Sequence, residues 1–134
     1  DCLLSRGLGD VYKRQGMQAL FETSEENGLC DGFGFLKGHV CHMEDTSVKI
    51  PQIGWNVLES NHPQAIFKEN TYVYYVHSYY AKDMDDQDLI GYSMYGSMKI
   101  PGLVMHDRIM GCQFHPEKSG EDGLKILEYF GKEF

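Results

Sequence analysis

Residues 109–119 read Ile-Met-Gly-Cys-Gln-Phe-His-Pro-Glu-Lys-Ser, and this stretch decides the fold class. Its first six residues are apolar or small except Gln113, the composition of a strand buried inside a sheet. We expect this strand to end at His115, because the proline that follows cannot donate a hydrogen bond to a neighbouring strand. An amphipathic pattern of helical period then covers residues 120–134. A buried strand that runs into an amphipathic helix is typical of an α/β protein.

His115 and Glu117 form the most informative pair of polar residues. A side chain at the end of a buried strand reaches the crevice where open α/β sheets usually carry function. Pro116 fixes the backbone between the two residues, and their spacing of two allows both side chains to point the same way. A carboxylate that holds one imidazole nitrogen prepares the other as a base, so the pair supplies two members of a Cys-His-Glu triad. The alternative is an exposed histidine near a helix start, with Glu117 as an ordinary acidic residue of the first turn.

The apolar patterns elsewhere predict several more elements. The pattern at residues 72–76 is aromatic, β-branched and apolar on both faces, so we expect a central strand there. Helical spacing also predicts a helix over residues 16–28. For residues 120–134, the predicted apolar stripe consists of Leu124, Leu127 and Phe130, with Ile126 beside it. Further strands are expected at 48–51, 89–94, 102–106 and 109–114.

Composition excludes several classes of function. The 134 residues suffice for one domain, and the net charge of −8 argues against a nucleic-acid-binding protein. No apolar run reaches the length of a membrane span, and no signal peptide is recognisable. The four cysteines include no Cys-x-x-Cys pair, so we expect reduced thiols in a cytoplasmic protein and no metal site.

Residues 1–15 differ in character from the rest of the chain. Their periodicity is weak, and it is interrupted by Gly7 and Gly9, whereas an orderly pattern begins at Gly16. We therefore interpret residues 1–15 as a foreign or artefactual extension and residues 16–134 as the C-terminal part of a larger domain. Strands absent from such a domain would leave an apolar sheet edge open.

Two other polar clusters are candidate binding sites. Ser78 and Tyr79 follow the strand at 72–76 and could contact a small polar substrate, or the tyrosine could simply cap the core. Trp55 beside Asn56 is typical of an interface anchor, although a partly buried core tryptophan fits equally well.

Taken together, these stretches resemble the glutaminase subunits of imidazole glycerol phosphate synthase, which are class I glutamine amidotransferases. The matching stretches, in order along residues 16–134, are GMQALFE, GFGFLKG, KIPQIGWN, YYVHSYY and GCQFHPEKSGEDGLKIL. The resemblance implies a glutamine amidotransferase-like α/β sandwich with a mixed central sheet whose N-terminal strands are missing.

The resemblance also implies an activity and a partner. The family hydrolyses glutamine and passes ammonia to a (β/α)8-barrel cyclase subunit, which forms imidazole glycerol phosphate in histidine biosynthesis. It implies a heterodimer and no metal or organic cofactor. The positions that match family site residues are His115 as base, Glu117 as its orienting carboxylate, Gln18, Ser78, Tyr79 and Glu26 for glutamine, and Trp55, Asn56 and Lys118 facing the cyclase.

The sequence departs from the family pattern at the nucleophile. In the family motif Gly-x-Cys-x-Gly-Met-Gln, the cysteine position falls on Arg14, whose guanidinium stays protonated and cannot act as a nucleophile. Gln52 stands where histidine is common. We therefore expect that this chain does not catalyse. One alternative is a non-catalytic pseudo-amidotransferase that still binds a cyclase barrel, and another is an unrelated metal-binding protein using His39, His42 and His77 or His115.

Overall fold

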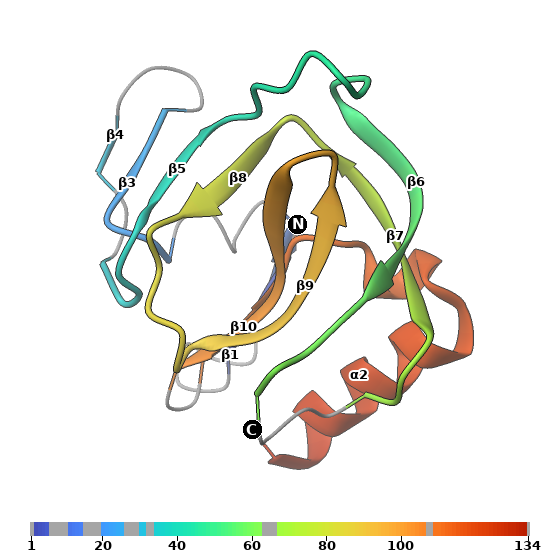
Figure 1. Cartoon of the computed structure of the whole chain (residues 1–134). Coiled ribbons are helices and arrows are strands. Elements are labelled where there is room, and N and C mark those ends of the chain that lie inside the picture. The colour runs from blue at the N-terminus through green and yellow to red at the C-terminus, as the bar shows by residue number, and fades with distance from the viewer. Residues whose placement is uncertain are drawn as a thin grey trace.

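The computed structural model describes residues 2–5, 11–14, 20–25, 30–31, 34–62, 67–106 and 109–133. Strands dominate this part of the chain, and one long helix, α2 (Gly120–Glu133), lies along one side of them (Figure 1). The protein is α/β with a mixed sheet, as the sequence predicts.

The largest sheet places the strand before His115 in its middle. It has five strands in the order β2-β1-β11-β10-β9, and every neighbouring pair is antiparallel. The members are β1 (Cys2–Ser5), β2 (Val11–Arg14), β9 (Leu89–Tyr95), β10 (Met98–His106) and β11 (Ile109–Cys112). The patterns at 89–94, 102–106 and 109–114 therefore correspond to real strands, although β10 begins before the Pro101-Gly102 step and passes through it with a register shift.

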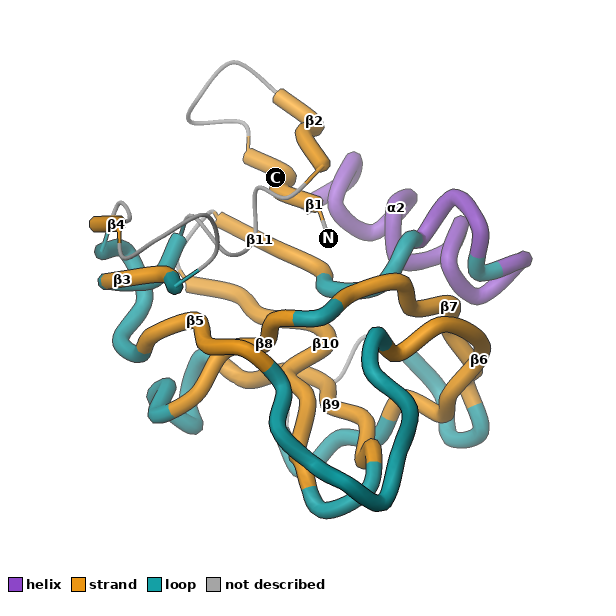
Figure 2. Tube along the Cα trace, turned by 90° about the horizontal axis from the view of Figure 1, so that it is seen from above, coloured by secondary structure: helices purple, strands orange, loops and turns teal. Residues whose placement is uncertain are grey.

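The other strands, labelled in Figure 2, form two smaller sheets. One has the order β4-β3-β5-β8, and its β3–β5 pair is parallel, which makes the architecture mixed. The other is the antiparallel pair β6-β7. Their members are β3 (Thr23–Ser24), β4 (Cys30–Asp31), β5 (His39–His42), β6 (Gln52–Leu58), β7 (Thr71–His77) and β8 (Tyr79–Lys82).

The expectation that the strand at 72–76 is central is wrong. Among the described strands, β7 is paired in register with β6 alone. Its residues alternate: Thr71, Val73, Tyr75 and His77 are buried, whereas Tyr72 keeps 53% of its surface exposed. The run of aromatic and β-branched residues hid this alternation, because large apolar side chains also occupy the outward face.

The helix expected over residues 16–28 is wrong for the described residues 20–25. This segment has turns and the short strand β3, and its backbone groups pair with a distant loop and strand instead of with each other. The Leu36 N–H donates to the Leu20 carbonyl at 3.0 Å, and the Glu22 N–H donates to Gly38 at 3.0 Å. Burial of Leu20 and Phe21 against residues such as Leu36 and Val40 outweighs their helical spacing.

Two further expectations need correction. The strand placed at 48–51 lies instead at β6, which starts one residue after Pro51. On α2, Ile126 is fully buried in the main core, but Leu124 is 52% exposed, so the predicted stripe is rotated. Tyr129 packs against the core on the same side as Ile126. The side chain of Phe130 lies outside the described residues.

Residues 1–15 contain the hairpin β1–β2, and β1 pairs along the whole of β11. The edge of β11 is therefore covered by β1, and the open apolar sheet edge expected from missing strands does not lie at β11. No helix in the described ranges is long and apolar enough to cross a membrane.

Candidate active site

His115 is held by the neighbouring strand β7 and by Ser119. Its backbone N–H donates to the carbonyl of Tyr74 at 2.9 Å. The Ser119 hydroxyl donates to the His115 carbonyl at 2.6 Å and accepts the Tyr74 N–H at 3.0 Å. Because both Ser119 and His115 are buried, these bonds fix the position of the imidazole after the end of β11.

Glu117 lies against the imidazole of His115, as the sequence predicts. The distance from His115 Nδ1 to Glu117 Oε1 is 3.3 Å. Pro116 opens the 3₁₀ turn η1 (Pro116–Lys118), which turns the chain so that side chains two residues apart meet. A carboxylate acceptor at Nδ1 favours the tautomer with its proton there and leaves Nε2 available as a base. The side chain of His115 is 10% exposed and that of Glu117 is 34% exposed, which places the pair at the rim of the fold.

Ser78 and Tyr79 form the bend between β7 and β8, and both are partly buried. The carbonyl of Ser78 accepts the Met43 N–H at 2.9 Å. The ring of Tyr79 meets the ring of His42 edge to face at 5.1 Å. The bend is thus tied to the end of β5 by the ring of His42 and to the residue after β5 by the backbone of Met43.

His77 and Gln52 form a buried polar pair that the sequence did not reveal as a pair. They lie directly opposite each other in the β6–β7 register, with His77 Nε2 2.7 Å from Gln52 Oε1. The other ring nitrogen, Nδ1, lies 2.8 Å from the Tyr79 carbonyl. Burial lowers the pKa of His77 to about 4 against the raising effect of the Tyr79 carbonyl, with a smaller lowering contribution from the neighbouring His115. The sequence did contain one signal for this pair. The alternation of residues along β7 turns His77 toward the core, where a buried polar side chain needs a hydrogen-bond partner.

Trp55 lies on an outward face of the β6–β7 pair. It is 56% exposed and meets Tyr74 edge to face at 5.8 Å across the strands. Ile53 and Val76, a second cross-strand pair on this face, are also exposed. This exposure contradicts the alternative of a core tryptophan.

Asn56 and Lys118 behave differently from Trp55. The Asn56 side chain donates to the Met94 carbonyl at 2.9 Å and accepts the Val57 N–H, so it ties β6 to β9. Lys118 is exposed at the end of η1, next to Glu117.

Some predicted site residues lie outside the described residues. These are Gln18 and Glu26, and the side chain of Arg14 is also not described, although its backbone ends β2 opposite Cys2. Cys112 is fully buried in the same core cluster as Phe114. Burial raises the pKa of the Cys41 thiol, so this cysteine is poorly suited to act as a thiolate.

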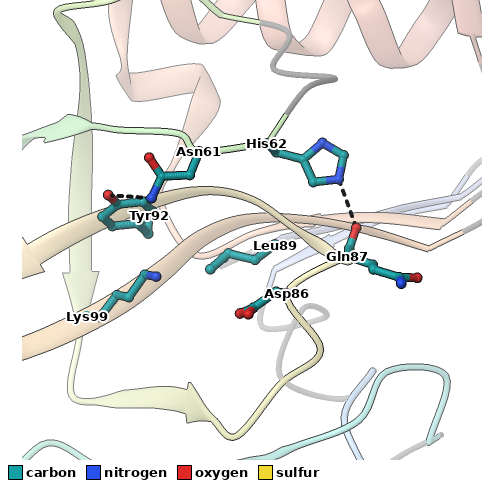
Figure 3. Close-up of a pocket in the computed structure, with 7 residues that line it drawn as sticks. All are labelled: Asn61, His62, Asp86, Gln87, Leu89, Tyr92 and Lys99. Carbon is teal, nitrogen blue, oxygen red and sulfur yellow. Dashed lines mark hydrogen bonds between the residues drawn. The ribbon is translucent and has the colours of Figure 1, made fainter.

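The metal hypothesis finds no support in the described ranges, where no group of three or more His, Cys, Asp or Glu side chains could hold an ion. A separate pocket of about 460 Å³ lies between the loops after β6 and β8 (Figure 3). Lys99 stacks on the ring of Tyr92 at 4.4 Å in it, and His62 contacts the Gln87 carbonyl at 3.0 Å. None of the predicted site residues lines this pocket.

A buried histidine held by a carboxylate follows β11, an arrangement that suits a general base in nucleophilic catalysis. The family model described as glutamine amidotransferase class-I matches residues 3–134. The chain belongs to the class I glutamine amidotransferases. Curated relatives of this amidotransferase chain include three proteins named imidazole glycerol phosphate synthase subunit HisH, from Geobacillus sp. (strain WCH70), Bacillus cereus (strain B4264) and Lactococcus lactis subsp. lactis (strain IL1403).

The three relatives are similar to this amidotransferase chain over most of its length. They are respectively 43%, 47% and 46% identical over 122, 118 and 121 residues, which covers 86%, 86% and 88% of this chain. The same matches cover 57%, 55% and 59% of the relatives. The chain therefore spans somewhat more than half the length of the curated relatives that it matches.

Proposed function

We propose that the chain is part of a glutaminase that hydrolyses glutamine and supplies ammonia to a cyclase subunit for imidazole glycerol phosphate formation in histidine biosynthesis. The relatives' names, which place them in imidazole glycerol phosphate synthase, support this choice within the family. The proposed partner is a (β/α)8-barrel cyclase subunit in a heterodimer, and the proposed location is the cytoplasm.

The observation that carries the proposal is the contact between His115 Nδ1 and Glu117 Oε1 at the end of β11. In the proposed mechanism the carboxylate holds the proton on Nδ1, and Nε2 takes the proton of a cysteine thiol as it attacks the side-chain amide of glutamine. The imidazolium then gives its proton to the leaving ammonia. Glu117 stabilises that cation without becoming protonated itself.

The proposed substrate and partner contacts come from different parts of the fold. Ser78 and Tyr79 at the β7–β8 bend, with Gln18 and Glu26, receive the amino-acid end of glutamine. Trp55 and Asn56 on β6 and Lys118 after η1 face the cyclase. Support for the second group comes from the exposed cross-strand pairs around Trp55, since large apolar side chains on a surface mark interaction sites.

The nucleophile is where this chain departs from the proposed reaction. Arg14 occupies the position of the family cysteine, and a guanidinium cannot replace a thiolate. We therefore propose that the 134-residue chain binds glutamine and the cyclase subunit but does not hydrolyse glutamine. The second candidate, a pseudo-amidotransferase that docks a cyclase barrel and does not hydrolyse glutamine, is favoured by the same residue and by the exposed face around Trp55.

The test combines the chain with the cyclase subunit of the Bacillus cereus synthase. We expect the wild-type chain to co-elute with the cyclase in size-exclusion chromatography and to release no glutamate from glutamine. An Arg14→Cys variant is compared with Arg14→Cys/His115→Asn, in which the base is lost. Glutamate release by the wild-type chain would contradict the inactive state, and failure to associate with the cyclase would contradict the proposed partner.

If Arg14→Cys restores hydrolysis and His115→Asn abolishes it, the roles of both positions are supported. Loss of a triad member typically removes about four to six orders of magnitude in rate. Equal hydrolysis by the single and double variants would contradict the assignment of His115 as base.

A further inference from the structure

The buried pair His77–Gln52 lies next to the β7–β8 bend, because His77 contacts the Tyr79 carbonyl. Both residues point to the inner face of the β6–β7 pair and are 8% and 3% exposed. On the same strand, the ring of Tyr75 packs between those of His77 and Phe114, at centroid distances of 5.3 and 6.1 Å. His77 is therefore enclosed by the core on one side and by the bend on the other.

The contacts of His77 fix where its proton lies. The Tyr79 carbonyl can only accept a hydrogen bond, so the Nδ1 atom 2.8 Å away carries a proton. Burial keeps the ring neutral, so Nε2 is left as an acceptor. Gln52 satisfies it when the terminal amide turns its NH2 group toward Nε2, because an amide offers an acceptor and a donor at similar positions.

This arrangement connects three strands at one point. Gln52 belongs to β6, His77 to the end of β7, and the accepting carbonyl to Tyr79 at the start of β8. The Met43 N–H holds the preceding carbonyl, that of Ser78, at 2.9 Å. The two carbonyls of the bend are thus held by two different donors, which orients the peptides on both sides of Tyr79, Ser78–Tyr79 and Tyr79–Tyr80.

We propose that His77 is a positioning residue for glutamine: its Nδ1–H holds the Tyr79 carbonyl and so fixes the backbone of Tyr79 in the bend that receives the amino-acid end of the substrate, while the Gln52 amide locks the ring in this tautomer. This role rests on the proposed function. His77 does not touch the substrate. It acts through the backbone of the bend, whereas His115 acts on the reacting atoms.

Two substitutions separate positioning from packing. In His77→Asn the side-chain amide NH2 occupies roughly the place of ring Nδ1 and can still donate to Tyr79. In His77→Gln the longer side chain reaches the place of Nε2 and contacts Gln52, but it leaves the Tyr79 carbonyl without that donor. Both variants lose an aromatic ring from the core, so their losses of stability are expected to be similar.

The measurement is the dissociation constant of glutamine for the 134-residue chain by isothermal titration calorimetry, with urea unfolding of each variant as the stability readout. We expect His77→Gln to weaken glutamine binding by about tenfold, the loss expected from one misplaced hydrogen-bonding group, and His77→Asn to stay near wild type. Nitrogen-15 spectra should show the wild-type ring neutral with its proton on Nδ1 at pH 7.

Each outcome has a separate meaning. If the wild-type chain binds no glutamine, the proposed function fails and the role of His77 fails with it. If the wild-type chain binds glutamine, and the two variants have the same dissociation constant as each other, the proposed function survives and the positioning role is overturned. This holds whether that shared constant equals the wild-type value or is weaker. A proton on Nε2 instead of Nδ1 would also overturn it.

Discussion

Ser119 is the residue whose replacement tests most directly how the His115 segment is held. Its hydroxyl donates to the His115 carbonyl at 2.6 Å and accepts the Tyr74 N–H at 3.0 Å, and the residue is 2% exposed. Ser119→Ala removes one oxygen atom and both bonds. Water cannot easily replace that oxygen at a position with so little exposure.

The expected cost follows from the two bonds separately. The His115 carbonyl keeps the Lys118 N–H at 3.0 Å as a donor, so the loss there is that of an ordinary hydrogen bond, about 0.5–1.5 kcal/mol. The Tyr74 N–H loses its acceptor in a buried place, which costs about 1–3 kcal/mol. We therefore expect Ser119→Ala to lower the free energy of unfolding by about 2–4 kcal/mol.

The assay is urea unfolding of the 134-residue chain followed by far-ultraviolet circular dichroism. With an m-value in the middle of the usual range, about 2 kcal/mol/M, the midpoint should fall by roughly 1–2 M. Thr46→Ala is the control, because Thr46 is exposed and water can take the place of its hydroxyl, and its replacement should change stability by less than about 0.5 kcal/mol. If Ser119→Ala is no more destabilising than this control, the reasoning about the buried bonds is refuted.

Three further predictions test the core, a loop and the outward face. Gly102→Ala would place a methyl group 2.5 Å from the Tyr75 hydroxyl, so we expect thermal unfolding to show a loss of about 1–3 kcal/mol in the free energy of unfolding. The loss should be smaller when Tyr75→Phe removes that hydroxyl, and a loss of the same size in the Tyr75→Phe background would contradict the clash. Hydrogen bonds from Ser47 and Ser97 hold the pKa of Asp45 well below its usual range, so stability from this carboxylate is present above about pH 4 and is lost as the pH falls toward the folded pKa. Asp45→Asn should flatten that acid limb of the stability curve, and an unaltered limb would assign it to other carboxylates. Trp55→Ala should weaken binding to the cyclase by about 2 kcal/mol in calorimetry with little change in unfolding, whereas Leu124→Ala, on the exposed side of α2, should alter neither.

The part of the fold predictable from sequence was the part governed by local pattern. The strand before His115 and the helix after Ser119 were expected because apolar runs and helical spacing are local signals. The contact of His115 with Glu117 was also expected, since a proline between residues two apart leaves few arrangements.

The parts that could not be predicted depend on distant partners. Residues 20–25 have helical spacing, but their backbone bonds go to residues 36–40, which no local pattern encodes. β7 was taken for a central strand because its outward residues are apolar, a feature of an exposed surface that composition cannot distinguish from a core. The pairing of His77 with Gln52 required the β6–β7 register, which the sequence alone does not specify.

The bonds between Tyr74 and the His115 segment also cover one edge of β7. The Tyr74 N–H and carbonyl, on the side of β7 away from β6, are both engaged by Ser119 and His115. An edge with free backbone groups attracts strands from other chains, and here a short turn occupies those groups in place of a strand. Any rearrangement that swings His115 away would uncover this edge. Variants that loosen this turn should therefore begin to self-associate as they lose their hold on the imidazole.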